Sequence, residues 1–204
     1  IVRPIDNDAF RIEEASGIVV RGFRIESRER GVRVRDESSN VEISGNEIVD
    51  CEVGVRLREG SGHVVLDNEI RDSLTGSGVR IREATGVEID GNTMSNLGDG
   101  GIRARLADGI VIVNNVLTDN GDEGIRVRET AGATIGDAEL GGNTASRNAQ
   151  AGIRVKDSTA IAIEANVTDD NGRYGIRTKF AAPIDDVADL IGAGNAAQCN
   201  GIAD

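Results

Sequence analysis

The stretch Gly31-Val32-Arg33-Val34-Arg35 returns along the chain as the pentapeptide Gly-Val/Ile-Arg-x-Arg/Lys. Its seven copies begin at Gly31, Gly54, Gly78, Gly101, Gly124, Gly152 and Gly175. Successive copies are 23 or 24 residues apart, except for one interval of 28 residues between Gly124 and Gly152. A fixed period of this length indicates a stack of repeated units rather than an ordinary globular domain.

Each repeat contains three short segments in which apolar and polar residues alternate. In residues 31–53 these segments are Gly-Val-Arg-Val-Arg, Val-Glu-Ile-Ser and Glu-Ile-Val-Asp, separated by turn residues. Alternation with a period of two is typical of strands with one buried face. Because strands this short need a partner, each is expected to pair in parallel and in register with its copy one repeat later. The sequence therefore predicts an all-β fold, a single parallel β-helix (solenoid) of about eight coils with three short strands per coil.

Aliphatic columns are expected to form the core of this solenoid. The first segments contribute Val32, Val55, Val79, Ile102, Ile125, Ile153 and Ile176, followed two residues later by Val34, Leu57, Ile81, Ala104, Val127, Val155 and Thr178. The second segments are predicted to contribute Val41, Val64, Val87, Ile110 and Ile161, and beside them Ile43, Leu66, Ile89, Ile112, Ile135 and Ile163. Their β-branched bias suits a pleated, stacked interior and agrees with an aromatic content of only 2%.

An asparagine follows the second segment at the same bend of the repeat. These residues are Asn46, Asn68, Asn92, Asn115, Asn143, Asn166 and Asn195. Asparagine tolerates the left-handed conformation, and its amide can bond to the copies above and below. We predict an Asn ladder that stabilises the turn rather than a ligand site.

With these motifs the chain resembles the right-handed parallel β-helices of the pectate-lyase-like superfamily. The likeness is closest to its short-repeat branch of carbohydrate-binding proteins, sugar hydrolases and periplasmic copper-accessory proteins. It rests on the Gly-Ile-x-x and x-Val-x-Ile-x-x-Asn segments, which extend from about Ala9 to Ile202. The resemblance implies that the Gly-Ile-Arg-x-Arg strands form the sheet on which members usually have their active sites. Since the connections beside these strands are short, no deep cleft is expected.

Composition suggests one domain, residues 1–204, which we interpret as a fragment or processed piece of a longer chain. Irregular loops are expected at residues 134–142 and 183–197. No stretch is long and apolar enough to insert into a membrane. The expected location is extracellular or on the cell surface, with the periplasm as the alternative. Cys51 and Cys199 are six coils apart, about 29 Å at about 4.8 Å per coil, too far for a mutual disulfide.

Outward positions of the first segments form two columns of cations. The first column is Arg11, Arg33, Arg56, Arg80, Arg103, Arg126, Arg154 and Arg177, and the second is Arg35, Arg58, Arg82, Arg105, Arg128, Lys156 and Lys179. Two interpretations of these columns remain open. One is a solvated ion network with Asp36, Glu37, Glu59, Glu83, Glu129 and Asp157, which follow the strands. The other is a binding stripe for an extended polyanion, because guanidinium groups bind carboxylate and sulfate bidentately.

Other functional signals in the sequence are weak. A net charge of −12 argues against nucleic acid as a partner. The family resemblance implies a lyase mechanism with an arginine base and Ca²⁺, and Asp99, Asp119, Asp122, Glu123, Asp169 and Asp170 sit in turns from which they could hold that ion. His63, the only histidine, is expected in a turn and not in a metal site, and Tyr174 alone offers no aromatic platform.

We therefore predict a non-catalytic structural or binding segment without a cofactor, whose partner would be an acidic polysaccharide. One alternative is a polyuronate lyase or epimerase that uses Arg103 or Arg126 as base. The other is a fibre that assembles through stacked coil ends, where unpaired backbone groups invite a second copy.

Overall fold

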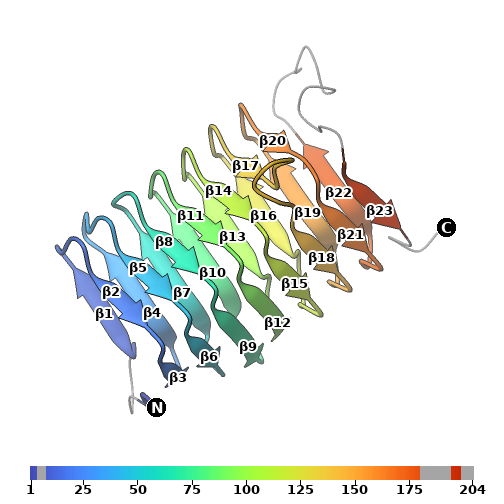
Figure 1. Cartoon of the computed structure of the whole chain (residues 1–204). Helices are drawn as coiled ribbons and strands as arrows, with labels where there is room; N and C mark the ends of the chain where they lie inside the picture. Colours follow the sequence, from blue (N-terminus) through green and yellow to red (C-terminus); the bar gives the residue numbers. More distant parts are fainter. Residues whose placement is uncertain (4–7, 180–193, 199–204) are drawn as a thin grey trace.

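The chain winds into a parallel β-helix whose coils stack along one axis, as the computed structural model in Figure 1 shows. The structure describes residues 1–3, 8–179 and 194–198. Every pairing between the strands of these residues is parallel and joins one repeat to the next. The predicted all-β solenoid with three short strands per coil is confirmed. Within the described part of the chain, no helix is long and apolar enough to cross a membrane.

The first sheet contains the repeated pentapeptides. Its strands, in spatial order, are β1 (Phe10–Glu13), β4 (Arg30–Arg35), β7 (Val53–Arg58), β10 (Ser77–Arg82), β13 (Ile102–Arg105), β16 (Ile125–Arg128), β19 (Ala151–Lys156) and β22 (Tyr174–Lys179).

The second and third sheets complete each coil. The second contains β2 (Val19–Arg21), β5 (Glu42–Ser44), β8 (Val64–Leu66), β11 (Glu88–Asp90), β14 (Val111–Val113), β17 (Thr134–Ile135) and β20 (Ala162–Ile163). The third contains β3 (Arg24–Glu26), β6 (Glu47–Val49), β9 (Glu69–Ser73), β12 (Thr93–Leu97), β15 (Val116–Thr118), β18 (Thr144–Ser146), β21 (Val167–Asp169) and β23 (Ala196–Gln198).

The core consists of the aliphatic columns that the alternation predicts, with one correction in the second sheet. Val65 pairs with Ile43 and Ile89 and is fully buried, whereas the predicted Val64 and Leu66 are partly exposed. The prediction was shifted by one residue, and such a shift exchanges the inward and outward side chains of a strand. His63, expected in a turn, consequently takes the inward position that valine has in the neighbouring coils.

The glycine of each pentapeptide is required by the close approach of neighbouring coils. A Cβ on Gly54 would lie 2.8 Å from the carbonyl oxygen of Gly78 and 2.5 Å from Cγ2 of Ile70. A Cβ on Gly101 would lie 2.8 Å from the carbonyl oxygen of Gly124 and 2.4 Å from Cδ2 of Leu117. The glycine that marks each repeat in the sequence is therefore required because neighbouring coils leave no room for a Cβ at this position.

The predicted Asn ladder is confirmed over all seven residues. The Nδ2 of each of the first six asparagines donates to the Oδ1 of its copy in the next coil, at 2.9 to 3.1 Å. A second, shorter ladder lies between the third and first sheets, where Asn120 donates to Asn148 at 2.9 Å and Asn148 to Asn171 at 3.0 Å. The sequence analysis missed this second ladder, because its column begins with Cys51, Ser73 and Leu97 and becomes asparagine only later.

The loop expected in the 28-residue interval is a tight turn. It is closed by backbone hydrogen bonds between Asp137 and Gly141, and Leu140 in it is exposed. Most of the second expected loop, residues 183–197, lies outside the described residues, and so does Cys199. Cys51 is a buried free thiol.

Candidate polyanion-binding face

The outer face of the first sheet is lined by the two predicted cationic columns. Strand pairing aligns Arg33 with Arg56, Arg56 with Arg80, and so on through Arg103, Arg126, Arg154 and Arg177. The second column is aligned in the same way from Arg58 to Lys179. Since parallel strands are about 4.8 Å apart, the face repeats a pair of positive charges at that spacing.

An acidic rim follows the second column along one edge of the sheet. In the seven coils where the structure describes it, the residue directly after the strand has a positive φ, and in six of these it is acidic: Glu14, Asp36, Glu59, Glu83, Glu129 and Asp157. In the remaining coil this position is Leu106, with a φ of 53°. Glu83 contacts Arg82 at 3.1 Å, and Glu129 contacts Arg105 at 2.9 Å and Arg128 at 2.8 Å.

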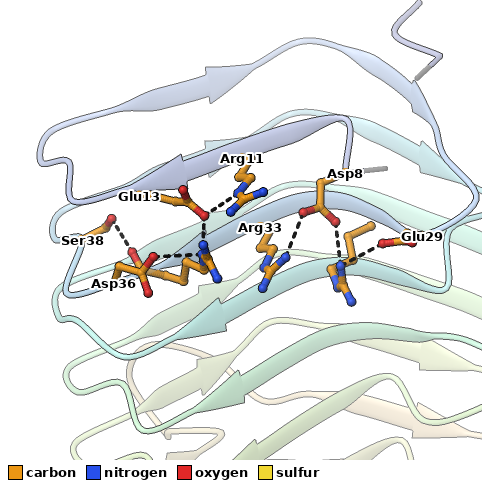
Figure 2. A network of polar contacts seen from close by, with 9 residues as sticks. Asp8, Arg11, Glu13, Glu29, Arg33, Asp36 and Ser38 are labelled. Atoms are coloured by element: carbon orange, nitrogen blue, oxygen red, sulfur yellow. Dashed lines mark hydrogen bonds and ion pairs between the residues drawn. The ribbon is translucent and has the colours of Figure 1, made fainter. Parts of the chain in front are cut away.

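A second set of carboxylates lies beside the first column. Asp99 contacts Arg80 at 3.3 Å and Arg103 at 2.5 Å, and Asp122 contacts Arg103 and, at 3.7 Å, Arg126. At the N-terminal end, Asp8 contacts Arg33 at 3.3 Å and Glu13 accepts hydrogen bonds from Arg11 and Arg35 (Figure 2). The ion network that the sequence suggested is therefore present, and it has acids on both sides of the columns.

Asp122 and Glu123 are neighbouring carboxyl groups whose pKa values are shifted in opposite directions. Burial, and next the neighbouring Glu123, raises the pKa of Asp122. Burial also acts to raise the pKa of Glu123, but its contacts with Arg154 at 2.7 Å and Arg126 at 3.5 Å outweigh this and lower it. Glu123 is 1% exposed, so this charge is held almost inside the coil. The pair ties the cations of three successive coils together.

Arg56 is a cation of the face that no carboxylate among the described residues contacts. Burial, followed by the guanidinium groups of Arg30, Arg33 and Arg80, lowers its pKa. At Arg56, as at Arg177 further along the first column, the ion network of the described residues leaves a positive charge without a counter-charge.

A depression of about 250 Å³ lies between the columns at the centre of the face. It is surrounded by Arg80, Arg82, Arg103, Arg105, Arg126 and Arg128. Ile81 and Ala104 form its floor, and since their side chains are buried in the core, the floor is main chain. This volume is just below the roughly 300 to 1,000 Å³ of common ligand pockets, in keeping with the short connections.

The structure gives four of the six turn carboxylates that were candidates for Ca²⁺, all except Asp169 and Asp170, arginine partners. Asp99, Asp122 and Glu123 contact arginines, and Asp119 accepts two hydrogen bonds from Arg147, at 2.8 and 2.7 Å. Within the described ranges, no three His, Cys, Asp or Glu side chains are grouped so that they could hold a metal.

The two remaining candidates from the sequence do not join the site. His63 is fully buried, and burial lowers its pKa. Tyr174 is 44% exposed, and the guanidinium of Arg177 lies 4.7 Å from the centre of its ring. The ring of Tyr174 is thus already covered on one face by a cation of the first column.

The chain belongs to the family described as right handed beta helix region, whose model matches residues 2–136 and 75–184. The coils therefore have the right-handed sense that the resemblance implied. No curated protein matches the sequence.

Two solved structures are similar to the chain. The A-module of mannuronan C-5 epimerase AlgE6 from Azotobacter vinelandii matches 96% of the chain with a TM-score of 0.68 and 14% identity. The chain spans 64% of the length of that module. A structure titled glycoside hydrolase matches 91% of the chain and 38% of its own length, with a TM-score of 0.44 and 8% identity. The first likeness supports the fold, and the second is too low to bear on it.

Proposed function

We propose that this β-helix is a non-catalytic recognition segment that binds an acidic polysaccharide along the outer face of its first sheet. The observation that supports this most directly is the pair of cationic columns, aligned in register over successive coils. A linear polyanion presents negative charges at regular intervals, and these columns present positive charges in the same manner. Arginine suits the task because its planar fork binds carboxylate and sulfate groups with two parallel hydrogen bonds.

The ion network leaves room for an external anion. Around the depression, six guanidinium groups share five carboxylates: Glu83, Asp99, Asp122, Glu123 and Glu129. Glu123 is also shared with Arg154, and Arg56 in the coil before the depression has no carboxylate partner among the described residues. A bound polyanion would supply the missing counter-charges without breaking the network.

Arginines of the second column can also exchange a carboxylate of the acidic rim for an anion of the ligand, and this favours binding. Arg82, Arg105 and Glu83 are substantially solvent-exposed, and ion pairs of this kind contribute only about 0 to 1 kcal/mol each. Their guanidinium groups can therefore turn to a ligand at small cost. Such binding is screened by salt, so the affinity is expected to fall as the salt concentration rises.

A polyuronate lyase or epimerase is the alternative from another functional class. The likeness to an epimerase module concerns the fold alone at this identity. Arg103 and Arg126, the candidate bases, both contact Asp122. Both guanidinium groups are therefore already engaged by a carboxylate of the protein. We therefore favour binding without catalysis.

The test is a binding screen of the chain against polygalacturonate, alginate and heparin at low and raised salt, with and without Ca²⁺. We expect binding that weakens with salt, and neither unsaturated nor epimerised sugar by ultraviolet absorbance and NMR. The double variant Arg103→Glu/Arg126→Glu should lose binding. The matched control Arg21→Glu/Arg147→Glu makes the same change of net charge outside the first sheet and should retain it. Binding that is unchanged in the first variant, or lost equally in both, would contradict the proposal, and sugar product would favour the enzyme.

A further inference from the structure

Among the described residues the acidic rim is interrupted once, and the interruption lies beside the central depression. Glu59, Glu83, Glu129 and Asp157 follow the second column in their coils, but Leu106 follows Arg105. Leu106 has the same backbone arrangement as the acids: its N–H donates to the carbonyl of Arg128 at 3.2 Å, as that of Glu83 donates to the carbonyl of Arg105. Only the side chain differs, and it is 41% exposed.

Leucine is an unusual choice for this position. Left-handed backbone is adopted mainly by Gly, Asn and Asp, and a bulky aliphatic side chain is uncommon there. The other coils show that this turn accepts Glu and Asp, so the fold does not require leucine. The consequence of leucine is electrostatic: Arg105 has no carboxylate from its own coil and contacts only Glu129 of the next.

Two N–H groups at the depression also lack partners. The Nε atoms of Arg103 and Arg128 are buried and have no hydrogen-bond partner among the described residues. Both arginines line the depression, one from each column. Buried donors are normally satisfied, so these two N–H groups, on arginines that line the depression, favour an acceptor supplied from outside the chain.

Building on the proposed function, we infer that the depression above Ala104 is a discrete anion subsite, which receives one carboxylate or sulfate group of the polysaccharide, and that Leu106 opens the acidic rim at this point. Arg105 and Arg128 approach the anion from the second column, and Arg103 from the first. Elsewhere along the face, a ligand anion meets a carboxylate at the rim in each coil.

The test is Leu106→Glu, which restores the continuous rim with a residue that the same turn accepts in other coils. A unit charge at about 4 Å in water changes the affinity about five-fold, so we expect heparin and polygalacturonate to bind at least about that much more weakly. Leu106→Gln, which is polar but neutral, should bind within about two-fold of the original chain. Leu74→Glu makes the same change at a side chain that is 91% exposed, outside the rim, and should also leave the affinity unchanged.

The outcomes separate this inference from the proposed function. Weaker binding in Leu106→Glu alone, with an unchanged unfolding transition, would support the subsite. Equal affinity of Leu106→Glu and the original chain, or equal weakening in Leu74→Glu, would overturn the subsite and leave binding along the face intact. If Leu106→Gln weakens binding as much as Leu106→Glu, the role of Leu106 is apolar contact and the electrostatic inference is wrong. Absence of binding by the original chain would overturn both.

Discussion

The Nδ2 of Asn92 donates to Oδ1 of Asn115 at 3.0 Å, and this bond is one of five that its buried amide group makes. Nδ2 also lies 2.8 and 2.9 Å from the carbonyl oxygens of Val65 and Asp90, so its two N–H groups are shared among three acceptors. Oδ1 accepts from the backbone and the side chain of Asn68, at 3.0 and 2.9 Å. One side chain thus joins three successive coils, so the ladder is a structural element and not a ligand site.

Replacement of Asn92 by alanine should therefore lower the stability substantially. It leaves buried donors and acceptors of three coils without partners, at about 1 to 3 kcal/mol per unsatisfied group. We expect a loss of about 3 kcal/mol in the free energy of unfolding, measured with urea. Asn114→Ala, at the exposed residue before the next ladder asparagine, removes two surface hydrogen bonds and should cost about 1 kcal/mol or less. Similar losses in the two variants would contradict the assigned role of the ladder.

His63 should make the stability depend on pH in a defined window. Burial lowers the pKa of His63 in the folded chain, whereas in the unfolded chain it takes up a proton near the ordinary value of about 6.5. The stability from the neutral ring is complete above that pH and is lost as the pH falls from there toward the folded pKa. His63→Val, which places the residue of the neighbouring coils at this position, should abolish this loss.

The size of the effect is on the order of 1 kcal/mol between about pH 7.5 and pH 5.5, read from urea unfolding curves of both proteins. Carboxylates with a lowered pKa do not contribute in this window, and Asp122, whose pKa is raised, is present in both proteins. The hydrogen bonds from Arg3 and Arg24, for example, lower the pKa of Glu26 to about 2, so its contribution is lost only below its unfolded value of about 4.3. Parallel pH dependence in the two proteins would exclude His63 as the cause.

Gly101→Ala should destabilise the coil at its closest contact. The added methyl would meet the backbone carbonyl of Gly124, which cannot move without disturbing the next coil. Overpacking of this kind costs about 1 to 3 kcal/mol. Gly22→Asn is the control: Gly22 has open space around it and a φ of 72°, which asparagine tolerates. Thermal unfolding should show a lower midpoint for Gly101→Ala only.

Cys51 should be inert in the folded protein. Burial raises the pKa of its thiol to about 11, and the thiolate is the reactive form. In a Cys199→Ser background, a thiol reagent at about pH 8 should modify Cys51 only as fast as the chain unfolds. Addition of urea should restore the rate of an ordinary thiol. Fast reaction of the native protein would show that the third-sheet side of this coil opens locally.

The fold could be predicted from the sequence because the strand and turn signals recur in every repeat. The prediction was wrong where a coil departs from the repeat. Counting three residues back from the ladder asparagine gives Ile43, Val65 and Ile89, all fully buried, so the ladder defines the register of the second sheet better than alternation does. Alternation failed there because Val64, Val65 and Leu66 are all apolar.

The site was predictable only in part. The two columns follow from the pleat of the strands, and the acids after them follow from the sequence. Partners such as Asp99 and Asp122 could not be assigned, because which arginine a turn carboxylate reaches depends on its path between two sheets. The signal for the central depression was present in the sequence as Leu106, which replaces an acid between Glu83 and Glu129, but this replacement has meaning only once the rim is known to be continuous in space.

The alignment of the columns also determines how a bound chain would be positioned. If all coils presented the same side chains, a ligand shifted by one coil would make the same contacts. Its binding free energy would then be the same in every register, and it could slide along the face. A single defect removes that translational symmetry. Leu106 is such a defect. It makes one coil of the surface different from its neighbours, and this difference fixes the register in which the polymer binds.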